Sequence, residues 1–229
     1  MDGVTVITGP RTGAGHLFAL LRNFEAVAPC DGLLSEGLND VASRIELAER
    51  EALARSCSLV VLKATSALPR DLVERDLLNR PGMRAIFVLR RSIDTYVSLA
   101  KATALGAWRD TDLTSVKVKL DAERFAVWLD QQEAWYAHWK AWLERRAFPL
   151  PVLRYETHIN VPVESVLRRF VMAVAQVGIT LRMPLSFPVA GLTRQDREKT
   201  VAFKVKNWPE FSRALTQMGL ERRAFGYPL

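Results

Sequence analysis

A glycine-rich turn follows the first apolar run of the chain. The run Val4–Thr8 leads into Gly9–Gly13, and a helical pattern begins near Gly15. Such a turn lets backbone N–H groups converge, and a helix start adds positive potential, so the junction suits a phosphate or a sulfate. Arg11 adds a full charge and a forked set of donors. The alternative is a plain tight turn between a strand and a helix.

The spacing of this turn differs from the phosphate loop of ATP-binding proteins. In that loop a lysine and a serine or threonine follow the second conserved glycine. Here Ala14, Gly15 and His16 follow Gly13. The turn therefore predicts an anion site without predicting an ATPase.

A second pair of candidate anion ligands comes later in the chain. Arg90 stands at the end of an apolar run, and Ser98 follows eight residues later in a helical pattern. Ligands of open α/β sheets bind at the carboxyl ends of the strands, so the two residues can hold a second phosphate. The alternatives are an ion pair for Arg90 and an ordinary helical hydroxyl for Ser98.

Short apolar runs alternate with helical patterns along the chain, which predicts an α/β fold with a mainly parallel central sheet. We find no linker strong enough to split it, so a single domain over residues 1–229 is expected. Residues beyond about 180 are predicted to be rich in loops. The predicted strands are Val4–Thr8, Leu59–Lys63, Ala85–Arg90 and Pro151–Tyr155. The predicted helices are Gly15–Asn23, Asp40–Ser56, Pro69–Leu78, Ser92–Leu105, residues 121–146 and Val163–Val177, with Ser92 as a candidate cap.

Three tryptophans of the longest helix, Trp135, Trp139 and Trp142, share one helical face. We interpret this stripe as core that packs on the sheet. An aromatic platform for a ligand is the alternative.

Composition limits the class of protein. The formal net charge is +7, and 49% of the 229 residues are apolar, as in a globular protein. The excess of basic residues suits an anionic ligand, which can be nucleic acid, a membrane face or a phosphorylated small molecule, and a merely basic surface is the alternative. Two cysteines, Cys30 and Cys57, form no disulfide framework, and the start of the chain lacks the basic segment of a signal peptide, so a cytoplasmic location is expected. No run reaches the ~18 apolar residues of a membrane span.

Together, the two anion elements resemble the sulfotransferases that use 3′-phosphoadenosine 5′-phosphosulfate (PAPS). In that family, a loop of proline, a basic residue, a hydroxyl residue and glycine holds the 5′-phosphosulfate, and Pro10–Gly13 match it. A later element with arginine, aspartate and serine at intervals of four holds the 3′-phosphate, and Arg90, Asp94 and Ser98 match it. The resemblance implies a three-layer sandwich of the P-loop-NTPase-like sulfotransferase fold.

Weaker similarities follow in the family's order and extend the resemblance over nearly the whole chain. They are Ser35–Asn39, Leu153–Glu156, Asn207–Trp208 and Gly226–Tyr227.

The resemblance implies that PAPS is the cofactor and that its 3′,5′-bisphosphate is the product. Arg11 would neutralise the leaving phosphate, and Lys63 would contact the bridging oxygen or the sulfonate. A partner carboxylate is the alternative role for Lys63. The implied cofactor-binding residues are Arg11, Thr12, Gly13, Ala14, Gly15, His16, Arg90, Ser98, Arg197 and Lys199.

Two departures from the family pattern affect the chemistry. Ala14 and Gly15 replace two hydroxyl residues, and Lys63-Ala64-Thr65 lacks the catalytic histidine of the small-molecule branch. Glu36 is then the first candidate for the general base, as in the carbohydrate- and tyrosine-modifying branches, and His16 is the second.

The resemblance implies a carbohydrate or small-molecule hydroxyl as the acceptor, with no nucleic acid as partner. The three histidines are widely spaced, so no metal site is predicted. The oligomeric state is left open. A nucleotide-dependent kinase with an atypical phosphate loop and a non-catalytic nucleotide-binding relative remain the alternatives.

Overall fold

The computed structural model describes residues 1–32, 40–108 and 111–229. The chain divides into two compact units, which are treated separately below. The expectation of a single domain stays a prediction. Unit 1 comprises Met1–Gly9, Gly13–Leu89 and Trp142–Gly191, and unit 2 comprises Pro10–Thr12, Arg90–Ala141 and Leu192–Leu229.

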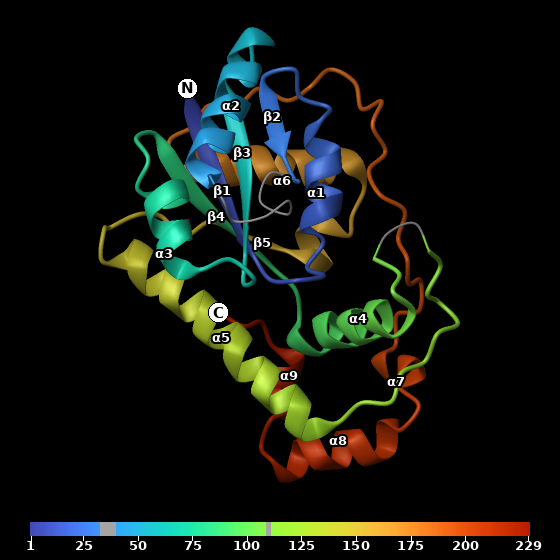
Figure 1. The fold of residues 1–229 in the computed structure, drawn as a ribbon. Helices are drawn as coiled ribbons and strands as arrows, with labels where there is room; N and C mark the ends of the chain where they lie inside the picture. The colour runs from blue at the N-terminus through green and yellow to red at the C-terminus, as the bar shows by residue number, and fades with distance from the viewer. Residues whose placement is uncertain (33–39, 109–110) are drawn as a thin grey trace. The chain divides into compact units, whose positions relative to one another are not determined.

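Unit 1 is built on a five-stranded sheet in which every strand pair is parallel (Figure 1). The strand order is β2-β3-β1-β4-β5. This confirms the predicted α/β class and its parallel sheet. The strands are β1 (Asp2–Thr8), β2 (Val27–Cys30), β3 (Leu59–Thr65), β4 (Met83–Leu89) and β5 (Val152–Arg154).

Strand β2 was not predicted from the sequence. It has four residues, and one of them is Pro29. A proline removes a backbone donor, which is tolerated on an edge strand, and β2 is an edge of this sheet. Its short apolar run was therefore too weak a pattern to predict a strand.

Both faces of the sheet are covered. Helices α1 (Ala14–Leu21) and α6 (Val163–Gln176) share one apolar cluster with Val4 and Val6 of β1. Because successive side chains of a strand point to opposite faces, the fully buried Ile7 belongs to the other face. Helix α2 (Val41–Ala54) and the π-helix η1 (Val73–Leu78) pack along β2, β3 and β4 (Figure 1). These layers are consistent with a three-layer sandwich.

Two predicted segments differ in detail. The predicted helix Pro69–Leu78 is a short turn, α3 (Arg70–Leu72), continued by η1. After β5 the chain forms a second π-helix, η2 (Tyr155–Ile159). Such widened turns are rare and occur frequently at functional sites.

Unit 2 contains the long helices α4 (Ser92–Leu105) and the part of α5 (Ala122–Glu144) up to Ala141. Its apolar core joins Ile93 and Val97 of α4 to Phe125 of α5 and Phe211 of the tail. The predicted Ser92 cap is wrong: Arg91 is the N-cap residue, no side chain caps α4, and the Ser92 backbone N–H donates to the Gly226 carbonyl at 3.0 Å.

The prediction of a loop-rich tail is wrong after residue 200. The tail forms α7 (Val201–Lys204), α8 (Trp208–Gln217) and α9 (Glu221–Phe225). Pro209 lies in the first turn of α8, where proline starts a helix instead of breaking one.

The side chains of the tryptophan stripe are buried, as predicted for a core stripe. Trp135, Trp139 and Trp142 are 4%, 0% and 2% exposed. The rings of Trp135 and Trp139 meet edge to face with 5.5 Å between their centroids. These side chains are packed inside the protein, which excludes the ligand platform.

Among the described ranges, no helix is both long and apolar enough to cross a bilayer.

Candidate functional site

Gly13 is the residue on which the phosphate-loop candidate depends in unit 1. It is the N-cap of α1 with φ +91°, a left-handed conformation that glycine adopts without strain. A Cβ at this position would lie 2.5 Å from the Tyr155 ring and 3.2 Å from Ile159, both of η2. The tight turn therefore requires glycine for its backbone angle and for the space that Tyr155 occupies.

The start of α1 offers backbone donors. Leu17 is the first residue whose N–H bonds back to the Gly13 carbonyl, at 3.0 Å, and no side chain caps the helix. The N–H groups of Ala14, Gly15 and His16 precede that bond, and a helix start of this kind attracts anions. Ala14 is buried, and its methyl group cannot donate a hydrogen bond.

His16 packs inside unit 1. A Cβ on Gly191 would come within 2.7 Å of the imidazole, so the ring lies against the Gly191 backbone. Gly191 has φ +81°, which again favours glycine. This contact gives His16 a packing role, and its role as a base stays a prediction.

Arg11 is held by hydrogen bonds to other residues of unit 2. Its Nε donates to Ser98 Oγ at 3.1 Å, one terminal nitrogen donates to the Trp108 carbonyl at 2.8 Å, and the other donates to Gln195 Oε1 at 2.5 Å. Arg11 itself has φ +59°, which is uncommon for a residue with a side chain. The guanidinium is thus fixed by acceptors from two distant segments of the sequence.

Arg90 lies in the same cluster. It donates to the Arg11 carbonyl at 2.9 Å. The neighbouring Thr12 is 3% exposed. Unit 2 therefore brings together Arg11, Thr12, Arg90 and Ser98, four of the predicted ligands, which the sequence spreads over nearly ninety residues. We name Arg11, Arg90, Ser98 and Gln195 the arginine cluster.

Asp94 has a different role from its neighbours in the motif. Its carboxylate is 6% exposed and pairs with Arg91 at 2.7 Å and with Lys204 of α7 at 4.0 Å. A buried carboxylate with such partners ties the first turn of α4 to the tail. Within the motif of Arg90, Asp94 and Ser98, Asp94 therefore stabilises the fold of unit 2.

Sequence reasoning missed a buried group of charges on α4 and the tail. Lys101 is fully buried and donates to Asp196 at 2.8 Å and to the Leu113 carbonyl at 3.0 Å. Lys204 lies 3.6 Å from the same carboxylate. Burial lowers the pKa of Lys204, and the charges of Arg90 and Lys101 act in the same direction, whereas Asp196 and Asp94 oppose the shift.

Few features of the amino-acid sequence predicted this group of buried charges. A lysine inside an amphipathic helix and an aspartate in a polar loop are usually solvated. The one sign in the sequence was the position of Lys101. It follows Ser98 by three residues and therefore lies on the same helical face as this motif residue.

Lys63 pairs with Asp31 in unit 1. Its Nζ also lies 5.8 Å from the centre of the Phe18 ring. The alternative that the sequence left open, a carboxylate partner, is thus present. Lys63 sits on β3, two residues before the strand ends at Thr65.

The two basic residues predicted in the tail differ in their contacts. Arg197 pairs with Asp112 at 2.6 Å, and its backbone N–H donates to Thr114 Oγ at 3.1 Å. Lys199 is exposed. Among the hydrogen bonds recorded between described residues, none joins Arg197 or Lys199 to the arginine cluster.

Glu36, the first candidate for the base, lies outside the described residues, as does the whole stretch Ser35–Asn39. Within the described ranges, no three His, Cys, Asp or Glu side chains form a group that could hold a metal ion.

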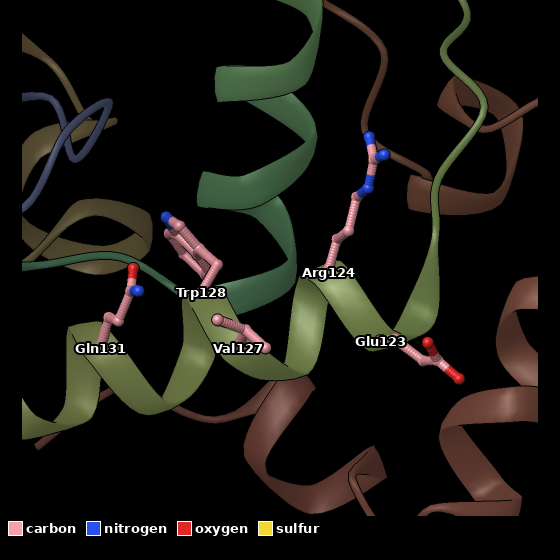
Figure 2. Close-up of a pocket in the computed structure, with 5 residues that line it drawn as sticks. All are labelled: Glu123, Arg124, Val127, Trp128 and Gln131. Atoms are coloured by element: carbon pink, nitrogen blue, oxygen red, sulfur yellow. The ribbon is translucent and has the colours of Figure 1, made fainter.

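A separate surface hollow of about 400 Å³ runs along α5. Figure 2 shows that its lining comes from this helix alone, with Arg124, Trp128 and Gln131 on one side. Val127, 59% exposed, is its main apolar surface beside Trp128. None of its lining residues belongs to the predicted site, so the hollow is not that site.

No protein-family model matches the chain, and no curated protein matches it.

Proposed function

We propose that this protein is a sulfotransferase that moves a sulfuryl group from PAPS to a hydroxyl of a carbohydrate or another small metabolite. The observation that supports this most is the arginine cluster. Arg11 comes from one segment and Arg90 and Ser98 from another, and hydrogen bonds of 3.1 and 2.9 Å join the three residues. Two guanidinium groups beside a hydroxyl are a donor set that suits a phosphate.

The topology of unit 1 supports a ligand at the carboxyl edge of its own sheet. The helix that follows β1 lies on one face, and η1, which follows the neighbouring β3, lies on the other. Ligands of α/β sheets bind at the carboxyl ends of strands where the connections diverge in this way. The Gly9–Gly13 turn begins at that end of β1.

In this proposal, backbone N–H groups at the start of α1 donate to the oxygens of the 5′-phosphosulfate, because Gly13 lets the chain enter the helix in a left-handed conformation and no side chain caps the helix. Arg90 and Ser98 anchor the 3′-phosphate in this proposal. Bound PAPS would supply the sulfuryl group, whose bond to the 5′-phosphate oxygen breaks as a bond to the acceptor oxygen forms.

The chain itself must then stabilise charge and take one proton. Arg11 neutralises the negative charge that develops on the leaving phosphate, as donors do in phosphoryl transfer. Glu36 accepts the proton of the acceptor hydroxyl. Lys63, two residues before the end of β3, is the second cation in the proposal, released from Asp31 when it acts.

The test is selective stabilisation by ligands. Adenosine 3′,5′-bisphosphate should raise the melting temperature in proportion to the logarithm of its concentration above Kd, and ATP with magnesium should do so far less. Equal or stronger stabilisation by ATP with magnesium would favour the kinase alternative. Binding of the bisphosphate without transfer of labelled sulfate from PAPS to any acceptor in a panel would favour the non-catalytic relative.

Arg90→Ala makes this test specific to the site. It should weaken bisphosphate binding at least tenfold, because a hydrogen bond to a charged group contributes about 1.5–3 kcal/mol. Arg213→Ala removes the same charge from the exposed surface of α8 and should leave binding unchanged. Equal affinities of the two variants would exclude Arg90 from the site.

A further inference from the structure

Gln195 is a polar residue of the tail that the sequence did not single out. Its side chain reaches the arginine cluster, where Oε1 accepts from Arg11 at 2.5 Å. Because the guanidinium only donates, the oxygen of the amide must face Arg11, and the NH₂ group must point elsewhere.

That NH₂ group is buried and has no hydrogen-bond partner among the described residues. Buried polar groups are nearly always paired, so an orphaned donor requires an explanation. It belongs to the same side-chain amide whose oxygen accepts from the Arg11 guanidinium. The cluster also contains Arg90 and the Ser98 hydroxyl. The simplest partner for a donor in such surroundings is an oxygen of an anionic ligand.

The segment around Gln195 is fixed firmly enough to hold such a donor in place. The Gln195 carbonyl accepts from the Leu113 backbone at 2.6 Å, and the Arg194 Nε donates to the Asp196 carbonyl at 2.6 Å. The Asp196 carboxylate accepts from the fully buried Lys101 at 2.8 Å. A backbone hydrogen bond at Gln195, a bond from the Arg194 side chain to the Asp196 carbonyl and a buried ion pair therefore restrain this segment.

We infer that Gln195 is a ligand-binding residue of the proposed nucleotide site: its Oε1 orients Arg11, and its Nε2 donates to a phosphate oxygen of the bound 3′,5′-bisphosphate. This inference rests on the proposed function. It adds the Gln195 Nε2 donor of the tail to the site. The buried Lys101–Asp196 pair then positions that donor.

The test compares phosphates as well as variants. Gln195→Met keeps the length of the side chain and removes both polar atoms. Calorimetry with adenosine 3′,5′-bisphosphate should show affinity at least tenfold lower than that of the wild type, since a bond to a charged oxygen is lost. With adenosine 3′-monophosphate, which lacks the 5′-phosphate that Arg11 neutralises in the proposed function, the variant and the wild type should bind equally, and with adenosine 5′-monophosphate the variant should bind more weakly.

Gln195→Glu is the second variant. It keeps an oxygen for Arg11 and replaces the donor with an acceptor, so it too should lose at least tenfold in affinity for the bisphosphate. Gln217→Glu makes the same change on the exposed surface of α8 and should bind like the wild type.

The outcomes separate the two claims. If the wild type binds the bisphosphate and the Gln195 variants bind it equally well, the role of Gln195 is wrong and the proposed function stands. An equal loss with the bisphosphate and both monophosphates would indicate a general structural effect and also overturn the inference. A wild type that does not bind the bisphosphate overturns both.

Discussion

The ring of Tyr155 fills the space where a side chain at Gly13 would begin, with 2.5 Å between the Tyr155 ring and a Cβ built on Gly13. Tyr155 opens the π-helix η2 after β5, and Gly13 caps α1 after the phosphate-loop candidate. The close approach makes the shape of the loop dependent on a residue more than 140 positions away in the sequence.

Gly13→Ala should destabilise the protein by about 2–5 kcal/mol. A left-handed conformation costs a residue with a Cβ about 1–2 kcal/mol, and overpacking costs about 1–3 kcal/mol more. Urea unfolding measures the loss. Gly178→Ala is the matched control, because Gly178 has φ +83° and nothing within 4 Å of the added Cβ. Equal losses in the two variants would mean that the Tyr155 contact costs nothing.

Lys101→Met should destabilise the protein by about 3–5 kcal/mol, because it removes one partner of a buried ion pair. Asp196 and the Leu113 carbonyl would each lose one donor, and Lys204 at 3.6 Å would be the cation that remains beside the Asp196 carboxylate. Chemical unfolding of this variant is compared with that of Lys117→Met, which removes an exposed lysine from the same unit. A loss no larger than that of the control would show that the buried pair contributes no net stability.

Asp112 should titrate well below an ordinary aspartate. Hydrogen bonds from the Thr114 side chain and backbone N–H, and then from Arg197, lower its pKa from 3.8 to about 2. Because the folded-state pKa is depressed, the associated stability is present above pH 3.8 and is lost as the pH falls through about 2. Carboxyl NMR titration should give a midpoint near 2 in the wild type. In Thr114→Ala the midpoint should rise, and an unchanged midpoint would exclude the Thr114 side chain as the main cause.

Glu36→Gln should lower kcat for sulfuryl transfer by about 100-fold or more, since a general base typically contributes that much. The amide keeps the size of the side chain and cannot accept the proton at neutral pH. Calorimetry with adenosine 3′,5′-bisphosphate should give an unchanged Kd. Full activity in this variant would move the role of base to His16 or to solvent.

The sequence by itself determined the parts of the fold that depend on local pattern. Apolar runs of β-branched residues predicted β1, β3, β4 and β5. Helical spacing predicted α4 with both of its ends correct. The tryptophan stripe and the glycine turn were readable for the same reason, because helical period and backbone freedom act between near neighbours. Patterns too short or too irregular, as in β2 and the tail helices, gave no such prediction.

Only the tertiary structure decided which side chains meet. Arg11 and Ser98 were predicted as ligands for opposite ends of one nucleotide, yet they are bonded to each other at 3.1 Å. Gln195 joins them from a loop that showed no motif, and Lys101 finds Asp196 from 95 positions away. Such contacts depend on how α4 and the tail pack around a shared apolar core, and that packing follows from many weak interactions that no local pattern contains.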